Sequence, residues 1–105
     1  MTQMIITFCT CPDKDTAAKL ARLLVENKLA ACVNIVPNMI SIYSWQGQIE
    51  SAEECLLIIK SSDQGYQAIE TTIRAHHPYE LPEIIAVPVE RALPEYINWI
   101  NSCHA

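Results

Sequence analysis

The chain has 105 residues, of which 50% are hydrophobic and 18% charged, and its formal net charge at pH 7 is −5. This length suits one core, and we expect residues 1–105 to form a single domain. The acidic balance and the lack of a Lys and Arg cluster exclude nucleic acid as an expected partner. Typical soluble domains are about one quarter charged. The lower fraction here predicts that some surface is buried against another subunit.

The compartment is predicted from the first residues and the cysteines. The start of the sequence lacks the pattern of a signal peptide, and no apolar run approaches the roughly 18 residues of a membrane helix. The five cysteines are an odd number without zinc-ribbon or C-x-x-C spacing. We therefore expect a cytoplasmic protein with free thiols and no membrane partner.

The first half of the chain predicts a strand, a helix and the start of a hairpin. Residues 4–11 form a short apolar run that is typical of a buried strand. Asp13 or Asp15 can cap the helix that follows, and this helix ends near residues 27–28. Its apolar face has helical spacing and comprises Ala17, Leu20, Ala21, Leu24 and Val25.

A long hairpin and two further helices follow. Residues 31–45 form a strand whose apolar face changes parity across residues 37–38, which predicts a bulge there. A turn at residues 46–47 leads to the partner strand at 49–60. We then expect a helix over 64–75 with Tyr66, Ile69 and Ile73 on one face, a strand over 83–89, and a last helix. Pro88 favours an edge position for that strand, and Pro94 lies in the first turn of the last helix, which carries Leu93, Ile97 and Ile100.

This order of elements predicts an α+β fold of the ferredoxin-like βαββαβ type, with an extended hairpin and a C-terminal helix. Right-handed crossovers give an antiparallel sheet with the strands in the order fourth, first, third, second. The topology brings Cys9, Cys11, His76 and His77 to the same end of the domain as the hairpin turn.

These cysteines and histidines are candidate metal ligands. His76 and His77 precede Pro78 at a stiff corner, and Cys9 and Cys11 point to the same face of their strand. Thiolates and imidazoles together suit copper and zinc. Each residue also has a structural interpretation: a strand Cys often packs as a small hydrophobe, and a His at a helix end can bond free carbonyls.

The hairpin itself carries a second set of candidates. Tyr43 and Trp45 share one face near its tip, where they either pack across the strands or reach onto a neighbouring subunit. The unusual length of the hairpin favours the second interpretation. The carboxylates of Glu50, Glu53 and Glu54 form a solvated strand face, or Glu50 lines a cleft.

Four motifs, in matching order and spacing, resemble the divalent-cation-tolerance (CutA) family over essentially the whole chain. They are Cys9-Thr10-x-Pro12-Asp13, Leu29-Ala30-Ala31-Cys32-Val33-Asn34-Ile35, Tyr43-x-Trp45-x-Gly47 and His76-His77-Pro78-Tyr79-x-x-Pro82-Glu83. The resemblance implies a compact homotrimer with hairpins that wrap the neighbouring subunits, and a link to copper and other divalent cations. It also implies Cys9, His76 and His77 as metal ligands. Cys11 is a candidate fourth ligand particular to this chain.

Three classes of function follow. The first is a cytoplasmic homotrimer that binds copper or other divalent cations in metal-ion tolerance. The alternative is a trimeric signalling module that senses a small molecule in clefts between its subunits. An enzyme of the acylphosphatase type ranks last, because residues 11–14 offer no Gly or Arg for a phosphate cradle, so we expect no catalytic activity.

Overall fold

The computed structural model describes residues 3–104 of the chain. Its elements follow in the predicted order and are β1 (Met4–Cys11), α1 (Lys14–Glu26), β2 (Cys32–Trp45), β3 (Gln48–Ser62), the short 3-10 helix η1 (Asp63–Gly65), α2 (Tyr66–His76), β4 (Ile84–Pro88) and α3 (Pro94–Ser102). The predicted α+β class and the βαββαβ order are therefore confirmed.

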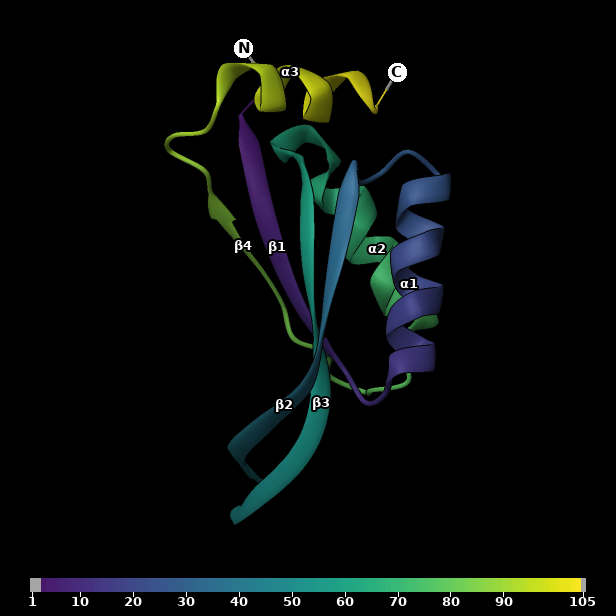
Figure 1. Ribbon diagram of the computed structural model, residues 1–105. Coiled ribbons are helices and arrows are strands. Elements are labelled where there is room, and N and C mark those ends of the chain that lie inside the picture. The colour runs from purple at the N-terminus through teal and green to yellow at the C-terminus, as the bar shows by residue number, and fades with distance from the viewer. Residues whose placement is uncertain (1–2, 105) are drawn as a thin grey trace.

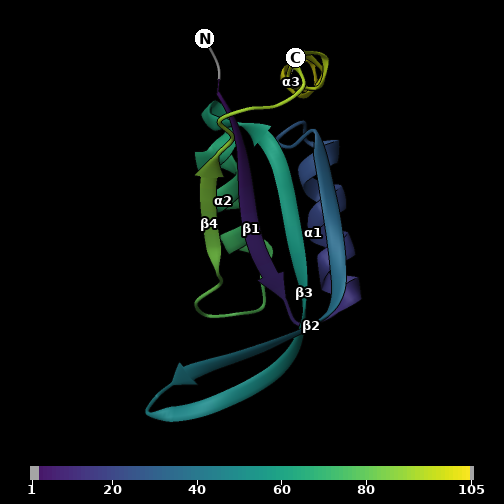
Figure 2. The same cartoon turned by 60° about the vertical axis from the view of Figure 1, so that its left-hand side comes forward.

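The four strands form one antiparallel sheet in the order β2-β3-β1-β4, as predicted. Helices α1 and α2 cover one face of this sheet and leave the other face open, while α3 lies across the end far from the hairpin (Figures 1 and 2). Strand β4 is an edge strand, so the position of Pro88 costs no ladder hydrogen bond to a further strand. None of the helices within residues 3–104 is both long and apolar enough to cross a membrane.

The main core lies between the sheet and its two covering helices. It joins Cys9, Cys11, Leu57 and Ile59 from the sheet with buried helical side chains that include Leu24, Ile69 and Ile73. Burying a side chain such as Leu57 stabilises the fold by roughly 1.5–3 kcal/mol. A second, smaller cluster forms beneath α3 around Met4, Ala31 and Ile100.

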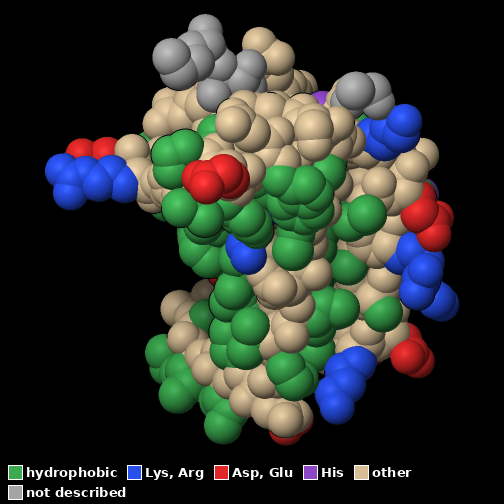
Figure 3. All heavy atoms as spheres, turned by 45° about the horizontal axis from the view of Figure 1, so that its top comes forward, with side chains coloured by type: hydrophobic (Ala, Val, Ile, Leu, Met, Phe, Trp, Pro, Cys, Tyr) green, Lys and Arg blue, Asp and Glu red, His purple; other side chains and the backbone are tan. Residues whose placement is uncertain are grey.

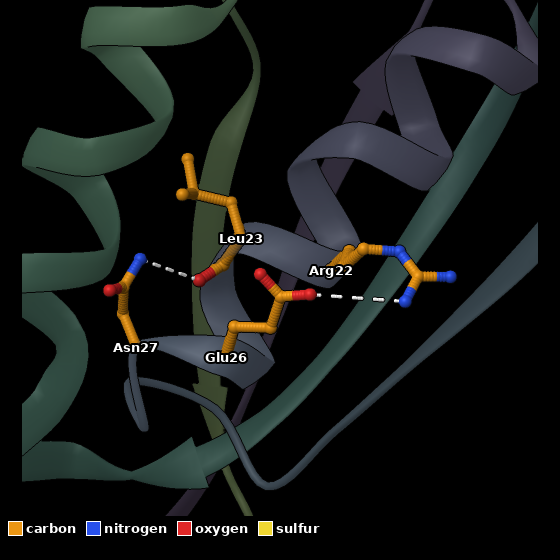
Figure 4. A network of polar contacts seen from close by, with 4 residues as sticks. All are labelled: Arg22, Leu23, Glu26 and Asn27. Atoms are coloured by element: carbon orange, nitrogen blue, oxygen red, sulfur yellow. Dashed lines mark hydrogen bonds and ion pairs between the residues drawn. The ribbon is translucent and has the colours of Figure 1, made fainter.

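The backbone turn and the polar contacts at the end of α1 differ in what they contribute to the end of this helix. The Asn27 side chain donates from Nδ2 to the Leu23 carbonyl at 2.9 Å, and Lys28 follows in the left-handed region with φ 58°. Arg22 and Glu26 form an ion pair of 3.8 Å on the solvent side (Figure 4). Since both side chains of the pair are exposed, it contributes little to stability, and the backbone turn is what ends the helix.

Asp13 is the N-cap of α1, as expected, and its Oδ1 accepts the Thr16 N–H at 2.8 Å. Three other predicted details differ from the structure. Val25, which was assigned to the buried face of this helix, is 42% exposed because it lies at the edge of the apolar stripe. Helix α2 begins at Tyr66 rather than 64, since η1 occupies the preceding turn. Leu93 precedes α3 as its N-cap and is exposed.

The β2-β3 hairpin extends well beyond the helices (Figures 1 and 2). Its register shifts between Val36 and Met39, and Asn38 takes a left-handed conformation with φ 62°, so the predicted bulge is confirmed. Gln46 and Gly47 both have positive φ at the tip, which is the geometry of the tight turns that match the strand twist. The residues of the hairpin itself therefore determine the bulge and the turn of this projecting arm.

Candidate metal centre

Three predicted residues meet where β1 ends. Cys9 and Cys11 both point to the helix-covered face of the sheet and are fully buried, and His77 follows α2 as its C-cap. One ligand atom from each of these residues lies within 4.8 Å of the other two, and this is the group of metal-ligating side chains found among residues 3–104. A soft-donor cluster is therefore present at the predicted end of the fold.

Two hydrogen bonds fix the imidazole of His77. Its Nε2 lies 2.7 Å from the Thr10 carbonyl, and its Nδ1 accepts the backbone N–H of Tyr79 at 3.1 Å. The carbonyl can only accept, so the proton of the neutral ring is on Nε2. A metal on Nδ1 replaces the bond from Tyr79 and leaves the Nε2–H to donate to the Thr10 carbonyl, an arrangement typical of metal-bound histidines.

His76 lies apart from this cluster. It is the last residue of α2, whereas His77 has extended backbone angles of φ −80° and ψ 137°, so the two side chains leave the chain in different directions. The His76 ring is exposed and its Nδ1 lies 2.9 Å from the Thr72 carbonyl. This is the helix-end contact that the sequence left open as an alternative.

The two thiols influence each other's ionisation. The Cys9 thiol donates to the Thr10 carbonyl at 3.7 Å, and the neighbouring Cys11 sulfur together with burial raises the pKa of Cys9 far above its usual range. The Cys9 thiol lowers the pKa of Cys11, because it can donate to the Cys11 thiolate once that forms. The first proton therefore leaves the pair as a whole, and the resulting thiolate is the form that binds a metal.

A second buried contact adjoins the cluster. The Tyr79 hydroxyl donates to Glu54 Oε2 at 2.6 Å, and the Tyr79 ring packs at 4.7 Å between centroids from the ring of His77. Desolvation and the bond to Glu54 raise the pKa of Tyr79. Glu54 is only 7% exposed, so its assignment to a solvated strand face was wrong. No pattern within β3 indicated this burial, because the residue that bonds Glu54 is Tyr79, 25 positions away in the sequence.

A cleft of about 710 Å³ lies beside this contact, between the projecting part of the hairpin and the loop that joins α2 to β4. Its walls carry the aromatic rings of Tyr43, Trp45 and Tyr79, and no Lys or Arg is among the lining residues identified within 3–104. The carboxylates that line it are those of Glu50, Glu54, Glu80 and Glu83. The surface is thus suited to a cation with an apolar body.

Comparison with known proteins places the chain in a family. Residues 5–103 match the family model described as CutA1 divalent ion tolerance protein. Protein CutA of Mus musculus is 45% identical over 94 residues, which are 90% of this chain and 53% of the mouse protein, so the chain spans about half the length of that relative. The divalent-cation tolerance protein CutA of Thermus thermophilus is 40% identical over 91% of this chain and 93% of its own. The crystal structure of CutA from Xylella fastidiosa superposes with a TM-score of 0.96 at 45% identity, covering 98% of this chain and 99% of that one. The chain therefore belongs to the CutA1 divalent ion tolerance protein family.

Proposed function

We propose that this protein is a cytoplasmic homotrimer that binds copper in metal-ion tolerance, with Cys9, Cys11 and His77 as the ligands. The observation that carries the proposal is the buried cluster whose three ligand atoms lie within 4.8 Å of one another. The family supports a role with divalent cations.

The donor set fits a soft or borderline ion. Two sulfurs and one imidazole nitrogen are the ligands that Cu(I) and zinc prefer over the hard ions of calcium and magnesium sites. A tetrahedral ion with bonds of about 2.0–2.3 Å separates its ligand atoms by roughly 3.5 Å. The present cluster therefore needs only a small contraction to close around an ion. Among these ions, two sulfurs and one nitrogen favour Cu(I).

His76 distinguishes this ligand set from the one that the family resemblance implies. Cys9 and His77 belong to both sets, while the third ligand is Cys11 in our proposal and His76 in the other. For His76 to bind, its ring must leave the Thr72 carbonyl and cross the helix end. The neighbouring imidazole therefore provides a matched control within the same dipeptide.

Competition titration with a Cu(I) chelator tests the ligand set. We expect Cys9→Ser, Cys11→Ser and His77→Ala each to weaken binding by more than about tenfold, since even loss of a group that only hydrogen-bonds a ligand costs about 10–100-fold. The His76→Ala variant should bind like the wild type. Wild-type affinity in all four variants would remove the site, and a loss in His76→Ala without one in Cys11→Ser would establish the alternative set. Imidazoles and thiolates bind metals in their deprotonated forms, so wild-type affinity should also fall in acid.

Exposed apolar surface supports the trimer. Ile40, Ile42 and Ile49 on the hairpin are 70%, 73% and 77% exposed, and Ile85 and Val87 are exposed on the open face of the sheet. Figure 3 shows hydrophobic side chains gathered over the middle and lower part of one side of the molecule. Contiguous patches of this kind mark interaction sites. Light scattering should give about three times 11.8 kDa, and a monomer mass would refute the assembly.

The compartment and the non-enzymatic role are further parts of the proposal. All five cysteines are free thiols, which suits a reducing compartment, and the family is named for tolerance of divalent ions rather than for a reaction. Fractionation of cells that produce the protein at its natural level should recover it with cytoplasmic markers. Recovery with membrane or exported proteins would contradict this assignment.

The cleft favours a second candidate function, the sensing of a small molecule. Its volume of about 710 Å³ is in the range of ligand pockets, and its aromatic and acidic walls suit an organic cation. A thermal-shift screen of metabolites, with Glu50→Gln as the variant that should lose the response, tests this function separately from copper binding. A screen without any stabilising compound would leave copper binding as the function that the protein's geometry supports.

A further inference from the structure

We propose that Cys11 and Cys55 form a reversible disulfide across β1 and β3 under peroxide, and that this bond removes a sulfur from the metal cluster. The two residues are direct partners in the antiparallel register of these strands. Both are buried, and both belong to the core cluster between the sheet and the helices. Cys55 has no role in the ligand sets considered above.

The backbone brings these two thiols within bonding range. Residues directly opposite each other in an antiparallel pair have Cα atoms about 4.5–5.5 Å apart and point to the same face. Disulfides require a Cα separation of about 4.4–6.8 Å, so rotation of the side chains is enough to join Cys11 and Cys55.

The other cysteines are less well placed for Cys11. Cys9 lies two residues away on the same strand, where Cα atoms are about 6.6–7 Å apart, at or beyond the limit for a disulfide. Cys32 lies on β2 opposite Lys60, and Cys103 follows α3 as its C-cap. The sheet register therefore selects Cys55 as the partner.

The oxidation balances with hydrogen peroxide as the oxidant. One thiol attacks a peroxide oxygen, breaks the O–O bond and becomes a sulfenic acid, with release of one water. The second thiol then attacks the sulfenic sulfur, forms the S–S bond and releases a second water. The two sulfurs lose two electrons in total and the peroxide gains them, while a small thiol reductant reverses the bond by exchange.

The consequence for the metal centre rests on the proposed function. A disulfide sulfur is no longer a thiolate and binds metals poorly, so the oxidised protein retains only Cys9 and His77 of the three ligands. Peroxide would then release copper from this site, and reduction would restore it. The sensitivity is specific to a chain with Cys at both positions 11 and 55.

Peptide mapping by mass spectrometry under non-reducing conditions tests the disulfide itself. The intact, metal-free protein is treated with hydrogen peroxide and its remaining thiols are alkylated. We expect a linked peptide pair that contains Cys11 and Cys55, in wild type and in the matched control Cys32→Ser, and no disulfide in Cys55→Ser or Cys55→Ala. A Cys9–Cys11 bond, or oxidation of Cys11 to sulfinic acid while Cys55 stays free, would overturn the proposal.

Cu(I) competition on the same samples tests the consequence. Wild type and Cys32→Ser should bind more than about tenfold more weakly after peroxide and recover with dithiothreitol, whereas Cys55→Ser should keep its affinity through both treatments. Unchanged Cu(I) affinity in wild-type protein that carries the Cys11–Cys55 bond would refute the claim that this disulfide weakens copper binding. If the reduced wild type binds no copper, the proposed function fails, and the peptide map still decides whether the disulfide exists.

Discussion

Removal of one hydroxyl group tests the buried contact beside the metal centre. In Tyr79→Phe, the ring can keep its packing against His77, and the backbone N–H that bonds Nδ1 of His77 is unchanged. The variant loses only the 2.6 Å hydrogen bond to Glu54. A hydrogen bond to a charged group contributes about 1.5–3 kcal/mol, and Tyr79 is partly exposed, so we expect a loss of about 1.5 kcal/mol at pH 7.

The effect should also depend on pH in one direction. Folding raises the pKa of Tyr79, so this group stabilises the fold below its unfolded pKa of about 10, and the contribution is lost as the pH rises towards the folded value. The stabilities of wild type and Tyr79→Phe should therefore converge above about pH 10. Below that pH, the wild type should remain the more stable of the two proteins.

Urea unfolding at fixed protein concentration, repeated across pH, measures both effects. Tyr66→Phe is the matched control, because its hydroxyl donates at 2.8 Å to Glu70 four residues along a helix and neither residue is buried. Such a pair contributes about 0.2–0.5 kcal/mol. Equal losses in the two variants, or a Tyr79→Phe deficit that persists unchanged at high pH, would refute the role assigned to burial of Glu54.

Two further predictions concern the hairpin and the start of α1. Trp45→Ala should lower the melting temperature and shift the assembly towards smaller species, because a packed Trp contributes roughly 3–5 kcal/mol, whereas unchanged melting and mass would show that Trp45 is not at an interface. Asp13→Ala should lower the melting temperature at neutral pH by leaving the Thr16 N–H without its cap. The hydrogen bonds from Thr16 lower the pKa of Asp13, so its contribution is lost as the pH falls below about 4, and the melting curves of wild type and Asp13→Ala should then coincide. Asp13→Asn should behave like the wild type at neutral pH and, because its amide does not titrate, should keep the contribution of the cap in acid.

The fold was predictable because local signals agreed along the chain. The apolar run of β1, the helical spacing in α1 and the parity change at residues 37–38 each have one structural solution, and the crossover rule then fixes the sheet order. The end of the domain at which Cys9 and His77 meet follows from that topology alone. Element boundaries were less certain, as η1 shows, because a 3-10 turn and the first turn of a helix share the same residues.

The contacts within the site were beyond the reach of sequence patterns. The sequence shows two adjacent histidines, but their separation depends on one change in backbone angles at the end of α2. Burial of Glu54 depends on Tyr79, which is 25 positions away, and no periodicity encodes that pairing. The Cys11–Cys55 pairing requires the register of β1 on β3, which follows only once both strand lengths are known.

The bulge at residues 37–38 determines which side chains lie on each side of the projecting hairpin arm. Val36 pairs with Leu56 and Met39 with Glu54, so β2 contains one residue more than β3 over this interval. Beyond the bulge, Tyr43 and Trp45 lie on one side of the arm and Ile40 and Ile42 on the other. Deletion of Asn38 would exchange these sides, so that Ile40 and Ile42 would take the side of the arm that now carries Tyr43 and Trp45. One inserted residue thus decides which side of the arm carries the aromatic side chains and which carries the aliphatic ones. Amino-acid composition alone does not contain this information.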